Sequence, residues 1–145
     1  MFGHGGEEIA EEVGMEGMHL GYVASDRLKA IAYSAADISI LPTRLDNLPL
    51  GIQESFACGT PVVSFAVGVV PELVQSYQTG YLASPEDAQD LSGGIVELLH
   101  AEGLRGEMGK TCRERVEQDY TLELKVQRYS ELYHKLLQWP SSTTP

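Results

Sequence analysis

Cysteine is scarce in this sequence: its 145 residues include only Cys58 and Cys112. Two cysteines are too few for a disulfide framework or a zinc cluster, so we expect two reduced thiols. Histidine is equally sparse, and its four copies show no spacing that would hold a metal ion. The sequence therefore predicts neither a disulfide-stabilised protein nor a metal site.

Basic residues and long apolar runs are also in short supply. Ten Lys and Arg stand against 21 Asp and Glu, which gives a net charge of −11. Nucleic acids and anionic membrane surfaces select clusters of Lys and Arg, so neither is an expected partner. No apolar stretch approaches the ~20 residues of a membrane span. Residues 1–14 lack the basic flank and apolar segment of a signal peptide. We expect a cytoplasmic setting, with contact to the inner face of a membrane only through a partner.

The sequence does contain enough apolar residues for a core, since 43% of it is hydrophobic. Short apolar runs alternate with segments of helical periodicity. The predicted strands are His19–Val23, Ile38–Leu41, Val62–Phe65 and Tyr81–Ala83. The predicted helices are Asp26–Ala36, Leu50–Cys58, Pro71–Tyr77, Ala88–Ala101, Leu104–Gln118 and Leu122–Leu137. This alternation indicates an α/β domain with a parallel sheet covered by helices, in which ligands bind outside the carboxyl ends of the strands.

The last two predicted helices differ in character. Leu104–Gln118 is rich in charge and is expected to be largely solvated. The next helix carries an apolar stripe on one face. The stripe consists of Leu122, Val126, Tyr129, Tyr133 and Leu136. We expect a partial domain over residues 1–138 and a disordered tail over 139–145. Met1-Phe2-Gly3 looks like the end of a strand, so the sequence is expected to start inside a domain.

The stretch LDNLPLGIQESFACGTPVV, residues 45–63, holds a predicted helix start at the end of a strand. Asn47 is a candidate N-cap, and Pro49 suits the first turn. Free backbone amides at a helix start form a ready anion site. The expected donors are Leu48, Leu50 and Gly51.

Two carboxylates flank this helix start. Asp46 and Glu54 lie very roughly 10 Å apart along the helix axis. That spacing suits the hydroxyls at two ends of an extended ligand whose phosphates lie between them. Helix capping alone would also explain an acid at this place. A glycosidase that uses the two residues as acid and base is a further alternative.

A series of motifs runs through residues 41–99. They are Pro42-Thr43, the acids Asp46 and Glu54, the run Ala57-Cys58-Gly59-Thr60-Pro61-Val62-Val63, Gly68, Pro71-Glu72 and Thr79-Gly80. In this order they resemble the C-terminal half of the retaining group 1 glycosyltransferases, the glycogen-synthase-like family with the two-domain GT-B fold. Weaker likeness extends back to Gly3 and forward to about residue 135.

The resemblance implies a Rossmann-like parallel sheet flanked by helices, the C-terminal domain of a GT-B fold, with its first strand and helix missing. It implies a nucleotide diphosphate sugar as donor, no cofactor, and retaining transfer of a glycosyl group to a glycan, lipid or small molecule. The further partners implied are an N-terminal domain, a partner chain or a second copy. The 145 residues alone are expected to be inactive. The alternative is a non-catalytic fragment or split subunit that binds nucleotide or an acceptor-domain chain.

Residue by residue, the resemblance implies that Asp46 contacts the donor sugar and that Glu54 holds the ribose, as the two residues of the catalytic site. The amides of Asn47–Gly51 would surround the sugar and the diphosphate. Tyr22 and Val23 would lie against the nucleobase, although an ordinary core interpretation suits both as well.

The sequence departs from the family pattern in four places. Asp46 stands where a longer Glu is usual, Asn47-Leu48-Pro49 replaces the frequent Gly-Phe-Gly, and Val69 stands where a second Gly is usual. The family's Arg/Lys pair for the diphosphate would lie upstream of the first residue. Arg44 is the only cation near the loop along the sequence, and we interpret it as a solvated surface charge.

Overall fold

In the computed structural model, which describes residues 17–138, three short parallel strands form the centre of the fold. The strands are β1 (Ser39–Leu41), β2 (Val62–Phe65) and β3 (Gly80–Ala83), in the order β1-β2-β3. In the register, Ser39 pairs with Val62 and Val62 pairs with Gly80. This arrangement confirms the predicted α/β class and the parallel sheet.

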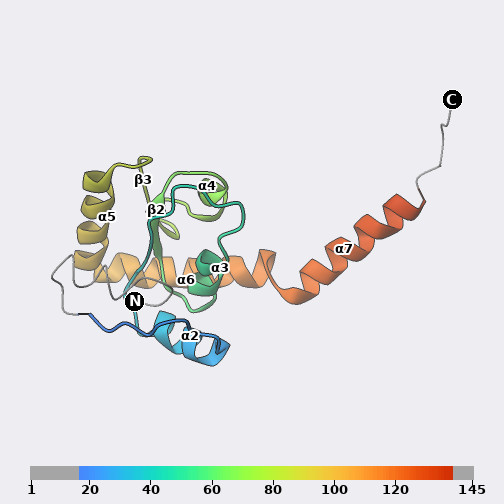
Figure 1. Ribbon diagram of the computed structural model, residues 1–145, viewed down its shortest axis with the longest axis horizontal. Coiled ribbons are helices and arrows are strands. Elements are labelled where there is room, and N and C mark those ends of the chain that lie inside the picture. Colours follow the sequence, from blue (N-terminus) through green and yellow to red (C-terminus); the bar gives the residue numbers. More distant parts are fainter. Residues whose placement is uncertain (1–16, 139–145) are drawn as a thin grey trace.

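Helices account for most of the other residues between 17 and 138 (Figure 1). They are α2 (Asp26–Ser34), α3 (Leu50–Ala57), α4 (Val70–Leu73), α5 (Ala88–His100), α6 (Glu102–Asp119) and α7 (Leu122–Leu137). Three side chains cap helix starts: Ser25 for α2, Asp87 for α5 and Thr121 for α7. The α3 helix ends at Ala57, one residue before the predicted end, and Gly59 follows its C-cap in the left-handed conformation with φ of 73°, as predicted.

The middle strand, β2, separates two apolar clusters. Successive strand residues point to opposite faces of a sheet. Val62 belongs to the cluster built by α3, α4 and α6, with Ile52, Phe56 and Cys112. Val63 belongs to the other cluster, with Leu98 from α5 and Met108 from α6. The α6 helix therefore contributes to both faces, through two residues that lie one turn apart.

The α6 segment is largely solvated as expected, apart from the buried Met108 and Cys112. Met108 is 1% exposed and Cys112 is fully buried. The surface of α6 is rich in charge, but two apolar side chains at i and i+4 are enough to anchor a helix. Both cysteines are free thiols, and burial raises the pKa of Cys112 to about 12.

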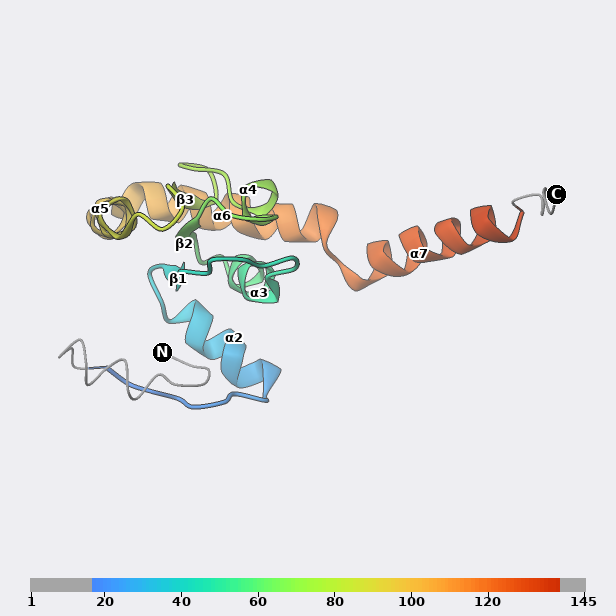
Figure 2. The same cartoon turned by 45° about the horizontal axis from the view of Figure 1, so that its top comes forward.

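The α7 helix reaches away from the rest of the chain, as Figures 1 and 2 both show. It begins and ends where predicted. Its stripe is exposed to solvent, by 50% at Tyr129 and 70% at Leu122. In residues 17–138 no helix has both the length and the apolar character that a membrane crossing requires.

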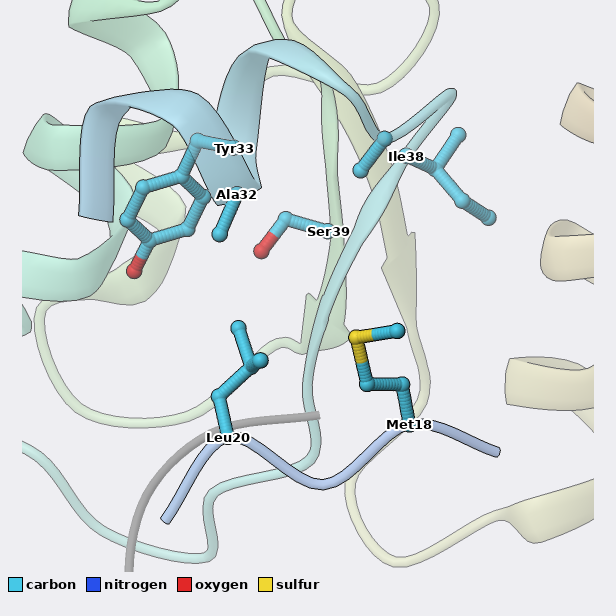
Figure 3. A pocket seen from close by; sticks show the side chains of 7 residues that line it. Met18, Leu20, Ala32, Tyr33, Ile38 and Ser39 are labelled. Carbon is cyan, nitrogen blue, oxygen red and sulfur yellow. The ribbon is translucent and has the colours of Figure 1, made fainter. Parts of the chain in front are cut away.

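The predicted strand His19–Val23 does not form. Gly21 has φ of 62°, in the left-handed region, which breaks an extended run. Met18 and Leu20 instead line a pocket beside α2 and β1, and both point into it (Figure 3). This segment covers one side of α2 and contributes no strand to the sheet.

The predicted helix Pro71–Tyr77 is shorter than expected. The α4 helix ends at Leu73, because Val74 adopts an extended backbone with ψ of 130°. Thr79 then accepts a hydrogen bond from the Gln75 amide, and Tyr77 adopts a positive φ of 64°. The chain is thus turned towards β3. The expected start at Met1-Phe2-Gly3 and the expected tail at 139–145 lie outside the described residues.

Candidate functional site

The candidate site lies at the carboxyl ends of β1 and β2, where two loops meet. After β1, residues 42–49 lead into α3, and after β2, residues 66–69 lead into α4. Gly68 packs directly against the backbone of Asp46. A Cβ atom at Gly68 would lie 2.6 Å from the Asp46 carbonyl oxygen, and φ at Gly68 is 52°. Only glycine combines that conformation with so close an approach.

Asp46 holds the loop before α3 in shape. Its Oδ1 accepts a hydrogen bond from the Leu48 amide at 2.9 Å, which is the pattern of an Asx turn. The prediction that Asn47 caps the helix is wrong. The N-cap position belongs to Pro49, which makes no side-chain cap, and Asn47 is exposed in the loop. Asp46 thus occupies the Leu48 amide, which would have stayed available to a ligand if Asn47 had capped the helix.

The first turn of α3 still offers backbone donors. The amides of Leu50 and Gly51 precede the point at which a helix supplies its own acceptors. Ile52, next along, donates to the Pro49 carbonyl at 3.0 Å. Of the three predicted donors, Leu48 is therefore engaged by Asp46, whereas Leu50 and Gly51 lie at the positive end of the helix dipole.

Glu54 lies about one turn further along α3 and faces α2. Lys29 donates to Glu54 Oε1 at 2.7 Å, and the Tyr33 hydroxyl lies 3.5 Å from Oε2. The hydrogen bonds to Glu54 and Asp26 raise the pKa of Lys29, so its ammonium is charged at neutral pH. Burial, and then the charge of Glu54, raise the pKa of Tyr33 to about 12. A pocket between α2 and α3 collects these groups beside Cys58.

Lys29 and Tyr33 are site residues that sequence reasoning missed. They stand at i and i+4 on α2, a spacing that places both on one face of a helix. That spacing is the one feature of the sequence that could have pointed to the pair. It gave no indication that Glu54, 25 residues beyond Lys29, would be the partner.

Tyr22 and Val23 lie just before α2 and differ in exposure. Tyr22 is 73% exposed, whereas Val23 is only 9% exposed. Of the two, Tyr22 is therefore the accessible side chain, and Val23 fits the core interpretation.

Two cations from a distant part of the sequence line a pocket at the start of α3. Lys125 and Arg128 line a pocket together with Leu48 and Leu50, at the start of α3. Arg44, the only cation expected near the loop, is 82% exposed and lies 4.0 Å from Glu86, in agreement with its interpretation as a surface charge. The start of α7 thus supplies basic side chains beside the candidate anion site.

A metal-dependent site has no support in the part of the chain that the structure describes. No three His, Cys, Asp or Glu side chains between residues 17 and 138 are grouped so that they could hold a metal ion. Along the chain the structure places one carboxylate in the loop before α3, free amides in the first turn of α3 and a second carboxylate one turn further on, and the exposed ring of Tyr22 precedes α2. The carboxylates suit hydroxyls, the amides suit an anionic centre and the aromatic ring suits a flat ring.

Comparison with known proteins decides the family. A sequence profile described as "Glycosyl transferases group 1" matches residues 7–115, which is most of the chain. The chain belongs to the group 1 glycosyltransferases. Its described part has the architecture of the C-terminal domain of the GT-B fold, as predicted. Asp46, Glu54 and the start of α3 all fall inside the matched region.

Individual relatives agree with this assignment. This chain is 31% identical over 102 residues to N-acetyl-α-D-glucosaminyl L-malate synthase of Bacillus anthracis. The aligned region covers 70% of this chain and 27% of that protein. Among solved structures, sucrose-phosphate synthase from Thermosynechococcus elongatus matches with a TM-score of 0.83 and 30% identity, over 90% of this chain and 33% of that one.

A third similarity, to HepE of Anabaena in complex with UDP and glucose, has a TM-score of 0.78 at 20% identity. It covers 89% of this chain and 35% of that one, and concerns the fold. The chain spans about a quarter of the length of the curated relatives that it matches first.

Proposed function

We propose that this chain binds a nucleotide diphosphate sugar and forms the donor half of a retaining glycosyltransferase. The observation that carries the proposal is the order of groups at the start of α3: a carboxylate in the loop, two helix-start amides, and a second carboxylate one turn on. An extended ligand with hydroxyls at both ends and phosphates in the middle matches this order.

In this proposal each group has one task. Asp46 accepts hydrogen bonds from the sugar hydroxyls, and Glu54 accepts them from the ribose. The amides of Leu50 and Gly51 receive the diphosphate, with the Asn47–Leu48 loop beside it. Tyr22 provides a face for the nucleobase, with Val23 behind it in the core.

The charge of the chain bears on the diphosphate. The net charge of −11 opposes a multiply charged anion in general. Local donors must therefore provide the favourable field, and a helix N-terminus does so over its first turn. Lys125 and Arg128, which border the same turn, add basic charge where it is needed. The UDP complex of HepE supports a nucleoside diphosphate in this fold.

Transfer of the sugar is the further part of the proposal. Departure of the diphosphate builds negative charge at the start of α3, and preorganised donors there would stabilise it. Transfer also requires an acceptor held against the anomeric carbon, and positioning supplies roughly 7–11 kcal/mol in favourable cases. We expect the 145-residue chain to bind donor and to show no turnover. Radiolabelled nucleotide sugars with candidate acceptors test this, and labelled product that Glu54→Gln abolishes would contradict it.

The binding proposal is tested by isothermal titration with UDP, GDP and ADP. If Glu54 accepts ribose hydroxyls, Glu54→Gln should weaken the preferred nucleotide about ten- to a hundredfold, because a hydrogen bond to a charged group is worth roughly 1.5–3 kcal/mol. Glu107→Gln makes the same charge change at an exposed position on α6, outside the pocket, and should leave affinity unchanged. Equal affinity of Glu54→Gln and wild type for every nucleotide would refute the assignment.

A further inference from the structure

Glu54 is surrounded by side chains of α2, and the contacts with its two carboxylate oxygens differ. Lys29 Nζ lies 2.7 Å from Oε1 and also 3.1 Å from Asp26 Oδ1. The Tyr33 hydroxyl lies at the longer distance of 3.5 Å from Oε2. One oxygen of Glu54 is thus engaged by a short charged hydrogen bond. The other accepts only the long hydrogen bond from Tyr33 and keeps most of its capacity to accept.

The environment of Lys29 is unlike that of an ordinary surface lysine. Its side chain is 23% exposed, compared with 96% for that of Asp26. Tyr33, one turn further along α2, is only 6% exposed. Lys29 therefore extends along a packed helix face, with its ammonium at the rim of the pocket that contains Glu54. An ion pair with one half-buried partner is restricted in geometry, which is what orientation of a carboxylate requires.

We propose that Lys29 is a positioning residue, which turns the Glu54 carboxylate so that Oε2 faces the ribose hydroxyls of a bound nucleotide. This inference rests on the proposed function, since it assigns a residue to the ribose contact of the same site. Lys29 acts through Glu54 and makes no contact with the nucleotide.

The charges around Lys29 argue against the simplest rival, in which its ammonium binds a phosphate directly. Asp26 and Glu54 both lie within 3.1 Å of the ammonium. Two carboxylates against one ammonium leave the cluster anionic overall, so a phosphate would be repelled. The helix-start amides at Leu50 and Gly51 are a better place for it.

The test compares two ligands that differ only in the ribose. It uses whichever of UDP, GDP and ADP binds best, and the 2′,3′-dideoxy form of the same nucleotide. Wild type should prefer the ribonucleotide about ten- to a hundredfold. Lys29→Met should weaken ribonucleotide binding by about tenfold and leave the dideoxynucleotide unchanged. Lys29→Arg, which keeps a donor for Oε1, should retain most of the preference. Lys110→Met, an exposed lysine on α6, is the matched control.

Each other outcome has a definite meaning. If Lys29→Met weakened the affinity for both ligands equally, Lys29 would have a direct contact or a general structural role. If the preference for the ribonucleotide were unchanged, Lys29 would have no effect on Glu54. Either result overturns the inference. If wild type binds neither ligand, or binds both equally, the proposed function itself fails. Melting temperatures accompany each titration, and Lys29→Gln replaces Lys29→Met if the latter does not fold.

Discussion

Asp46 lies in the loop before α3 and Glu54 lies inside α3, and the two carboxylates are held in different ways. Asp46 is fixed by its own loop, through the Leu48 amide and the close approach of Gly68. Glu54 is fixed by α2, through Lys29 and Tyr33. One end of the site therefore depends on local backbone geometry, whereas the other depends on the packing of two helices. Substitutions should separate the two ends.

The largest loss of stability is expected for a substitution in the buried face of α3, the helix on which both carboxylates depend. Ile52 is fully buried on the core face of α3, between the two carboxylates in sequence. Ile52→Ala should lower the free energy of unfolding by about 2–5 kcal/mol, because the lost side chain leaves a cavity. Urea denaturation followed by circular dichroism measures it. Leu50→Ala, at a position 57% exposed, is the control, and an equal loss there would contradict this account of α3.

The next effect should fall on the Asp46 end alone. Gly68→Ala places a Cβ atom 2.6 Å from the Asp46 carbonyl oxygen at a positive φ. We expect a loss of roughly 1–3 kcal/mol in unfolding free energy and a shift of the loop. Binding of a nucleotide sugar should weaken more than binding of the free nucleoside diphosphate.

The control for this variant is Gly106→Ala, on α6. A Cβ atom there meets nothing within 4 Å, so the substitution should stabilise the helix by roughly 0.5–1 kcal/mol. Titration calorimetry with both ligands follows the binding. If Gly68→Ala weakened the free nucleotide as much as the nucleotide sugar, the two ends would not be separable.

A smaller effect is expected for the Asp46 carboxylate itself. Asp46→Asn keeps an oxygen that can accept from the Leu48 amide, so the loop should keep its shape. Only the charge is lost, and affinity for the nucleotide sugar should fall by about tenfold, with the free diphosphate unaffected. Asp46→Glu should be tolerated, because the loop is polar and partly exposed. A matching loss for both ligands would place Asp46 at the nucleotide instead.

The smallest effect should come from the exposed stripe on α7. Val126 and Tyr133 are each 58% exposed, so Val126→Ser and Tyr133→Ser should change the unfolding free energy by less than about 0.5 kcal/mol and leave nucleotide affinity unchanged. Sedimentation would show whether the same substitutions reduce self-association, which the apolar stripe favours. A large loss of stability would mean that the stripe is covered in the folded protein.

Much of the fold was predictable because its signals are local. The strand Val62–Phe65 is buried at every position, and a strand that is apolar except at Ser64 is typical of the centre of a parallel sheet. The bounds of Leu122–Leu137 are predictable from its regular apolar spacing, and in the structure Thr121 caps its start. The order of the motifs likewise placed Asp46 and Glu54 beside one helix start.

The features that the sequence did not predict depend on contacts between residues far apart in sequence, or on which of two adjacent side chains accepts a given hydrogen bond. Asn47 and Asp46 are both good acceptors at a helix start, and only the backbone path shows that Asp46 takes the donor. Lys29 reaches Glu54 across two helices. The basic residues Lys125 and Arg128 come to Leu48 only because α6 crosses the whole core before α7 begins.

The contrasting burial of Cys58 and Cys112 gives the protein two built-in reporters of opening. Cys58 is partly exposed and lines the pocket of Glu54, whereas Cys112 is fully buried where α6 meets α3 and α4. A thiol reagent can reach Cys58 in the native state. It can reach Cys112 only after α6 separates from the sheet, when its pKa falls from about 12 towards the value of a solvated thiol. The labelling rate of Cys112 therefore measures how often this helix detaches, and that of Cys58 measures how often the pocket is occupied.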